Sequence, residues 1–257
     1  AQLGGAVTRL DADDWPVPST RWQALHLDPA RGGGAISVND GKLSVDAPGG
    51  KATHVYPSLV SLGPATDANT TATVTSSALT LFEALPFLAS SLALMEPLAL
   101  TYSTPPLARD VDVVGPASLV VFLSSLLPEA DIHAVVADVW PDGSPHPVGI
   151  GRLRTSFPYV VPERSLVDGN GEIVQPYADH AAKTYAMPAE TREYHVELWP
   201  IGNRFQAGHR LRLYLLGPPN YVLPAPSVNL VSIGGNTPSR LLLPVLPGSD
   251  LHAAIRD

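Results

Sequence analysis

The segment DIHAVVADVWPDGSPHPVGIGRL, residues 131–153, decides the fold class of this chain. Apolar side chains occupy both faces of an extended strand over Asp131–Trp140, as is typical of a strand buried between two layers. The turn Pro141-Asp142-Gly143-Ser144 follows, because proline presets φ and glycine accepts a positive φ. Residues Val148–Leu153 then return as the hairpin partner. This pattern predicts an all-β protein and argues against alternating βα units.

A second segment with strict alternation is His209–Leu216. Its odd positions from 211 to 215 are leucine, whereas the even positions are Arg210, Arg212 and Tyr214. We therefore expect a strand with one face in the core and the other in water.

The rest of the chain is divided into short apolar runs by 27 prolines and 21 glycines. The spacing is typical of a sandwich or barrel. Asn39-Asp40-Gly41 predicts a hairpin turn, and Gly63–Ser77 and Val160–Lys183 predict long loops. Further strands are expected at Arg21–Leu27, Ala35–Val38, Lys42–Asp46, Leu98–Tyr102, Ser118–Ser125, Tyr194–Trp199, Val228–Ile233 and Arg240–Val245.

One segment, residues 78–97, departs from the β pattern. Leu88, Leu92 and Met95 recur at helical spacing after Pro86, and Pro97 ends the run. We expect a short helical insertion here, within a single domain that spans residues 1–257.

Composition excludes several function classes. The chain has no cysteine, which excludes disulfides and thiolate chemistry, and its net charge of −8 disfavours nucleic acid and anionic membranes as partners. The most apolar window, 78–95, contains Glu83 and Pro86, so we expect no membrane span. Composition leaves the compartment open: a soluble protein, either cytoplasmic or secreted.

No catalytic motif is present. A serine hydrolase of the α/β type needs its nucleophile in a Gly-x-Ser-x-Gly elbow, and no serine here has glycine two positions before it. Metal-binding His-Glu-x-x-His and glycine-rich phosphate loops are also absent. We therefore predict no catalytic residue, no metal site and no cofactor.

Other polar and aromatic residues admit two interpretations. His133 and His195 are expected to be structural, and the carboxylates around residues 11–14 and 110–112 are better explained as solvated turns than as calcium ligands. A tryptophan could form a sugar-stacking platform, although packing in the core or at its rim is the simpler explanation. The four tryptophans are Trp15, Trp22, Trp140 and Trp199.

Several segments, taken in order, resemble the C-terminal domain of the cocaine esterase and X-prolyl dipeptidyl-peptidase family. They run from about Asp13 to Val245. The matching segments are DDWPVP (13–18), LTYSTPPL (100–107), ADVWPDG (137–143), FQAGHRLR (205–212) and PSRLLLPV (238–245). The resemblance implies a jelly-roll β-sandwich, similar in shape to galactose-binding domains. It also implies that the catalytic triad belongs to a separate α/β-hydrolase domain, so no catalytic residue is carried onto this chain.

The resemblance predicts a non-catalytic accessory domain of a serine esterase or dipeptidyl-peptidase. Its expected partner is an α/β-hydrolase domain, in the same chain or as a separate one, whose acyl pocket it helps to shape. The apolar side chains Leu81, Phe82, Leu85 and Leu88 are candidates for this interface or for contacts in a homo-oligomer, although burial in the domain's own core is an equal alternative. A free-standing carbohydrate-binding module is the second hypothesis, and a purely structural jelly roll the third.

Overall fold

The computed structural model describes residues 9–58, 92, 93, 95–217 and 227–256. These residues form an all-β domain, which confirms the predicted class. The strands are β1 Arg21–Arg31, β2 Asn39–Ser44, β3 Ala52–Ser58, β4 Leu100–Ser103, β5 Val111–Ser125, β6 Asp131–Val139, β7 Pro145–Arg154, β8 Leu166–Val167, β9 Ile173–Gln175, β10 Arg192–Phe205, β11 Arg210–Leu216, β12 Ser227–Ile233 and β13 Arg240–Val245. Among the helices of the described residues are η1 Glu96–Leu98, η2 Pro162–Arg164 and α3 Leu251–Arg256.

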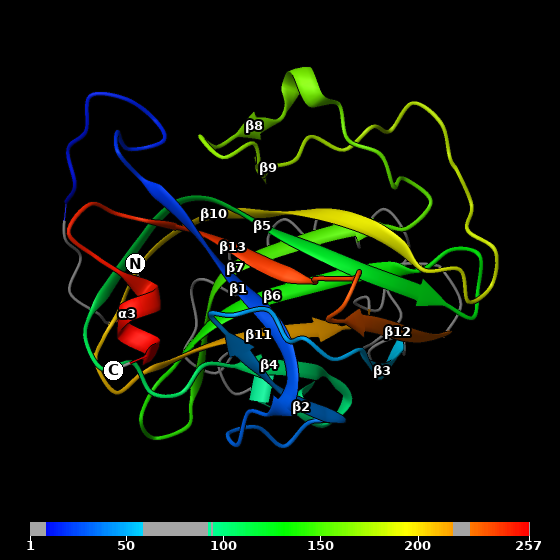
Figure 1. The fold of residues 1–257 in the computed structure, drawn as a ribbon, viewed down its shortest axis with the longest axis horizontal. Helices are drawn as coiled ribbons and strands as arrows, with labels where there is room; N and C mark the ends of the chain where they lie inside the picture. The colour runs from blue at the N-terminus through cyan, green and yellow to red at the C-terminus, as the bar shows by residue number, and fades with distance from the viewer. Residues whose placement is uncertain (1–8, 59–91, 94, 218–226, 257) are drawn as a thin grey trace, which may run out of the picture.

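The main sheet closes on itself. Its strand order is β10-β7-β6-β11-β4-β2-β1-β13-β5-β12-β3, and β10 also pairs with β5. This extra pairing joins the first strand of the order to the ninth, so the sheet forms a barrel-like sandwich. Strands β1, β13 and β5 lie in one wall, and β6, β11 and β4 lie in the opposite one (Figure 1).

The hairpin of residues 131–153 is confirmed. Strands β6 and β7 pair in antiparallel register from Asp131–Arg154 to Val139–Pro145. The turn between them is closed by the amide of Gly143, which donates to the carbonyl of Trp140 at 2.9 Å. Gly143 has φ of 88°, a conformation that glycine adopts without a steric penalty.

Strand β5 organises one wall of the sandwich. It extends over Val111–Ser125, seven residues further toward the N-terminus than predicted, and is buried on both faces along most of its length. One edge pairs with β10, and the other pairs with β13 and then with β12. A strand with neighbours on both sides and layers on both faces explains the nearly unbroken run of apolar residues.

The core lies between the two walls and draws residues from nearly every strand. Leu25, Leu119, Val136, Leu213 and Phe205 are fully buried in one continuous cluster. Full burial of such side chains contributes about 1.5–3 kcal/mol each. The core is therefore assembled from segments that are distant in sequence.

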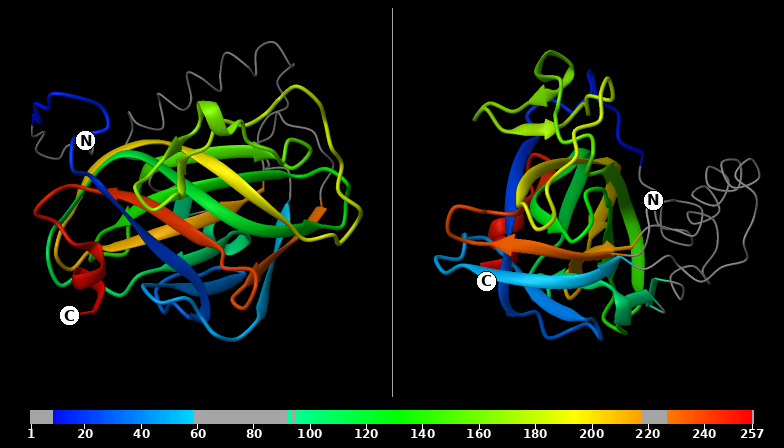
Figure 2. Two further views of the ribbon diagram at one scale, coloured as in Figure 1. Left: turned by 45° about the horizontal axis from the view of Figure 1, so that its top comes forward. Right: turned by 90° about the vertical axis from the view of Figure 1, so that its right-hand side faces the viewer.

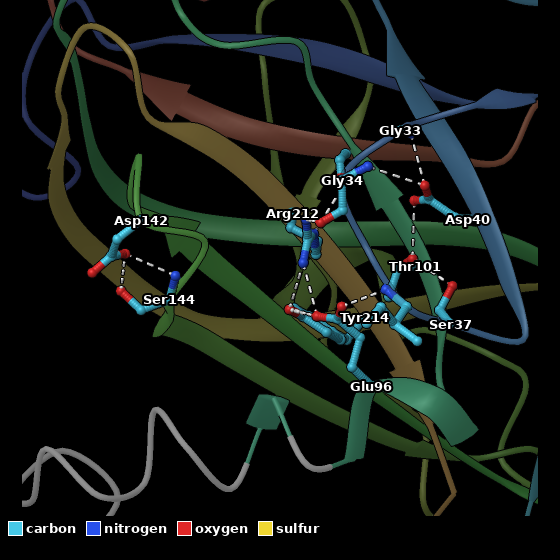
Figure 3. A network of polar contacts seen from close by, with 12 residues as sticks. Gly33, Gly34, Ser37, Asp40, Glu96, Thr101, Asp142, Ser144, Arg212 and Tyr214 are labelled. Atoms are coloured by element: carbon cyan, nitrogen blue, oxygen red, sulfur yellow. Dashed lines mark hydrogen bonds and ion pairs between the residues drawn. The ribbon is translucent and has the colours of Figure 1, made fainter.

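The predicted turn at Asn39-Asp40-Gly41 is wrong. Residues 39–44 form β2, and the expected strand Ala35–Val38 is a loop. The chain instead turns at the glycine run 32–34, where the carboxylate of Asp40 accepts hydrogen bonds from the amides of Gly33 at 2.7 Å and Gly34 at 3.2 Å (Figure 3). The turn therefore lies before Asn39, because the side chain of Asp40 on β2 caps the glycine run.

The structure also contains β3, a strand that was not predicted. Among the described residues β3 pairs with β12 alone, so it is an edge strand, which tolerates its Pro57.

Between β7 and β10 the chain leaves the sheet, and we call residues 156–191 the excursion. The excursion is largely the predicted long loop, but it contains η2 and the small β8–β9 sheet. Several contacts anchor it to the main sheet; among them, the Ser118 hydroxyl donates to the carbonyl of Ile173 at 3.2 Å, and Arg240 pairs with Glu172 at 2.6 Å. Figure 2 shows the excursion lying over one side of the sandwich. The excursion is therefore held against the main sheet by these contacts.

Candidate functional site

A hydroxyl, an imidazole and a carboxylate meet at the turn between β6 and β7. The Ser144 hydroxyl donates to the Asp142 carboxylate at 2.6 Å (Figure 3). The Ser144 oxygen also lies 3.0 Å from Nε2 of His146, whose ring stacks on Trp140 with centroids 4.1 Å apart. These residue types are those of a serine hydrolase triad, in which the order of the hydrogen bonds is decisive.

The order of the hydrogen bonds does not fit a triad. In a triad the serine donates its proton to histidine, and a carboxylate orients the other ring nitrogen. Here Ser144 donates to Asp142, so the His146 ring must donate to the serine oxygen. These contacts hold the pKa of Asp142 below its usual value, and burial lowers the pKa of His146. Ser144 is therefore a turn residue and not an activated nucleophile.

A second imidazole–carboxylate pair lies close by, formed by Asp138 and His209. Nδ1 of His209 lies 2.8 Å from Oδ1 of Asp138, and the amide of Asn203 donates to the other carboxylate oxygen at 3.2 Å. All three side chains are buried. Among the hydrogen bonds of the described residues, no hydroxyl contacts His209. This pair joins β6, β10 and the start of β11, which is a structural role.

The most extensive polar network surrounds Arg212 on β11. Its guanidinium pairs with Glu96 at 2.8 Å, donates to the Ser103 hydroxyl at 2.8 Å and contacts the Tyr214 hydroxyl at 3.2 Å. It also donates to the carbonyl of Gly34 (Figure 3). The network therefore connects β11, β4, η1 and the loop after β1.

The burial of Arg212 and Tyr214 corrects the prediction that this face of β11 is wet. Arg212 is 1% exposed and Tyr214 is fully buried. Tyr214 packs with Leu92 and Ala99, which cover this face of the strand, and this burial raises the pKa of its hydroxyl. An arginine that alternates with leucines predicts a solvent-exposed face only when no other part of the chain covers that face. Here Leu92 and Ala99, which are distant in sequence, cover it.

The predicted interface residues Leu81, Phe82, Leu85 and Leu88 lie outside the described residues. Leu92, from the same predicted insertion, is 6% exposed and belongs to the cluster around Tyr214. The C-terminal end of the insertion thus contributes to the core of the domain.

The tryptophans do not form a shared platform. Trp15 and Trp199 are more than half exposed, at 54% and 52%, on different parts of the chain. The indole of Trp22 donates to the carbonyl of Pro116 at 2.9 Å, and Trp140 is the residue stacked on His146.

Two further classes of site are absent from the described part of the chain. Its acidic and histidine side chains form no group of three or more that could hold a metal ion. None of the helices among the same residues has the length and apolarity of a membrane span.

His133 gives a prediction for the pH dependence of stability. Burial, and to a lesser extent the charge of Arg152, lowers its pKa to about 4. The unfolded chain takes up this proton near pH 6.5 and the folded chain does so only near pH 4, so folding stability falls as the pH drops through this window. We expect His133→Phe to flatten the loss by about 2–3 kcal/mol in urea titrations between pH 8 and pH 4.

The same titrations contain their own control. At pH 8 His133 is neutral in both states, so the difference between the variant and the wild type there measures the change in packing and the lost hydrogen bond with the Gly217 backbone, without a contribution from protonation. If the free energy of unfolding fell equally with pH in the variant and in the wild type, His133 would not be the cause of the loss.

The solved structures with a similar fold include several hydrolases. A CocE/NonD family hydrolase from Staphylococcus aureus matches with a TM-score of 0.67 and 16% identity over 92% of this chain and 39% of its own. An aminopeptidase from the marine sediment archaeon Thaumarchaeota archaeon matches with a TM-score of 0.61 and 16% identity, over 91% of this chain and 38% of its own. An α-amino acid ester hydrolase matches with a TM-score of 0.57 and 17% identity, over 87% of this chain and 36% of its own. The chain thus spans under two fifths of each of these proteins.

A family model agrees with the structural comparison, whereas no curated protein matches the sequence. The model describes the X-Pro dipeptidyl-peptidase C-terminal non-catalytic domain and matches residues 1–222. The rejection of both His–carboxylate clusters as catalytic centres agrees with that description. The chain belongs to the family of X-Pro dipeptidyl-peptidase C-terminal non-catalytic domains.

Proposed function

We propose that this chain is the accessory domain of a serine hydrolase that cleaves ester or peptide bonds. It packs on an α/β-hydrolase domain, in the same chain or as a separate one, and helps to wall the acyl pocket. The family match carries the proposal, because this family is the non-catalytic part of hydrolases. We further propose that the sandwich has the jelly-roll connectivity of galactose-binding-like domains.

Exposed apolar side chains favour one end of the domain as the docking surface. Ile36, Val38 and Leu98 are exposed at 80%, 43% and 42%. They lie together, because the amide of Ile36 donates to the Glu96 carboxylate at 2.7 Å and the amide of Val38 to the carbonyl of Ala99 at 3.1 Å. Leu98 follows the predicted interface residue Leu88 by ten positions, whereas Ile36 and Val38 lie in the loop after β1. A contiguous apolar patch rimmed by polar groups is typical of a contact surface.

We predict that the chain alone is catalytically silent. The Ser144 proton is held by Asp142, and no serine of the sequence lies in a Gly-x-Ser-x-Gly elbow, so we expect no activated serine nucleophile. Hydrolysis of nitrophenyl acyl esters and X-prolyl anilides should equal that of a heat-killed control. Turnover that a serine-directed inhibitor abolishes would contradict the proposal.

The accessory role is tested with the hydrolase domain that carries a Gly-x-Ser-x-Gly elbow in the same or a neighbouring reading frame. With this chain present, the hydrolase domain should gain stability and change its preference among acyl chain lengths. Leu98→Ser should weaken the association, whereas Val167→Ser, an exposed site on the excursion, should not. An unchanged acyl preference would exclude the pocket-shaping role, and no association would exclude the accessory role.

A further inference from the structure

A groove opens where β7 and β10 diverge. Within the described residues the two strands share a single paired position, Leu198 with Gly151. Beyond it lies a cavity of about 420 Å³ under the excursion. That volume is within the usual range for small-molecule sites, about 300–1,000 Å³. The lining residues are Asp131, Arg152, Leu153, Arg154, Phe157, Pro176, Tyr177, Ala178, His180, His195 and Glu197.

One wall of the groove carries two oriented guanidiniums. The carboxylate of Asp131 is 2% exposed and lies 3.3 Å from Nε of Arg154 and 3.8 Å from a terminal nitrogen of Arg152. Both arginines stay about one third exposed, at 31% and 34%. Asp131 therefore holds the two arginines in place while leaving part of each at the groove.

The opposite wall comes from β10 and supplies acceptors. The Glu197 carboxylate accepts a hydrogen bond from the amide of Gln175 at 2.9 Å, which fixes its position. His195 contacts Glu193 at 3.2 Å through Nε2, and its buried Nδ1 has no hydrogen-bond partner. Desolvation lowers the pKa of His195, so the ring is neutral and adds no positive charge to the groove.

The roof of the groove is aromatic and held in place. Phe157 packs against His180 with ring centroids 5.0 Å apart, and Arg164 stacks over the ring of Tyr177 at 3.6 Å. The chain on which Tyr177 lies is fixed by its bonds to Val161 at 2.8 Å and Ser165 at 3.0 Å. Ordered aromatic rings beside polar groups provide an apolar contact surface within a hydrogen-bonding site.

The charges of the lining residues identify the ligand class. Arg152 and Arg154 balance Asp131 and Glu197, so the site favours neither an anion nor a cation. Guanidinium and carboxylate groups are planar and bind pairs of donors or acceptors, which matches the adjacent hydroxyls of a sugar. We propose that this groove binds a neutral polyhydroxylated ligand, a mono- or disaccharide, between the paired arginines and the ring of Tyr177.

This site is independent of the proposed hydrolase partner, and isothermal titration of the chain alone tests it. The probes are D-galactose, D-glucose, lactose and cellobiose, with inorganic phosphate as the anionic competitor. At least one sugar should bind in the millimolar range, and phosphate should bind more weakly. Arg152→Met and Tyr177→Ala should each lower the affinity by about tenfold or more.

Matched variants separate the groove from general effects. Arg256→Met removes an exposed arginine paired with Asp46, and Tyr185→Ala removes an exposed tyrosine of the excursion outside the groove. Both should bind as the wild type does. The melting temperature of Tyr177→Ala shows whether the fold is intact, and Tyr177 is itself 40% exposed. Preference for phosphate, binding of no sugar, or equal binding by the groove variants would each overturn the proposal.

Discussion

Replacing Arg212 with methionine should lower the free energy of unfolding by about 3–5 kcal/mol, because the change removes a buried cation and leaves the Glu96 carboxylate, which is only 12% exposed, without its partner. Glu96 would keep only the Tyr214 hydroxyl, at 2.8 Å, and the backbone amide of Ile36 as donors. Ser103 and Gly34 would also lose their shared donor. Urea denaturation at pH 7 measures the loss.

A surface arginine supplies the control for this experiment. Arg204 makes a two-pronged pair with Asp112 at 2.7 and 2.9 Å, but it is 57% exposed. Arg204→Met should therefore lower stability far less than Arg212→Met does, because an exposed ion pair is screened by water. Arg212→Lys should restore less than half of the lost stability, since an ammonium cannot reproduce the guanidinium fork. Similar losses at both arginines would show that the buried network is not the cause.

The second large effect is expected at Gly151, where β7 meets β10. A Cβ at this position would lie 2.3 Å from the carbonyl oxygen of Glu197 and 2.7 Å from the side chain of Leu198. Gly151→Ala must therefore push apart the single paired position that joins these strands, at a cost of about 3 kcal/mol. Thermal and urea unfolding should both report the loss.

Gly202 is a suitable comparison, because it lies on β10 and a Cβ added there would meet no atom within 4 Å. Gly202→Ala should change stability by less than about 1 kcal/mol. If Gly151→Ala lowered stability no more than Gly202→Ala does, the close contact between β7 and β10 at Gly151 would not be needed for the stability of the fold.

Local sequence signals predicted the parts of the fold that depend on neighbouring residues. The β6–β7 hairpin follows from alternating apolar residues around a Pro-Asp-Gly turn, and both strands form as expected. The turn at Asn39-Asp40-Gly41 failed because Asp40 caps the preceding glycines with its side chain. Strand β3 was missed because its Pro57 is tolerated only at the edge of a sheet, a position that the sequence does not reveal.

The polar sites could not be predicted for the same reason. Asp138 and His209 are 71 positions apart, and Arg212 and Glu96 are 116 apart. Each pair becomes adjacent only when the sheet closes. The alternation of Arg210, Arg212 and Tyr214 with leucine predicts a two-faced strand correctly, but it carries no information about what covers the second face.

The pairing of β1 with β13 has a consequence for the synthesis of the protein. Arg21 lies opposite Val245, so β1 meets one of its two neighbours only after β13 has been synthesised. A ribosome delivers residues in order, and contacts between distant residues form slowly. In the nascent chain one edge of β1 therefore lacks its native neighbour until β13 emerges. Closure of the sandwich at this seam must therefore follow synthesis of β13.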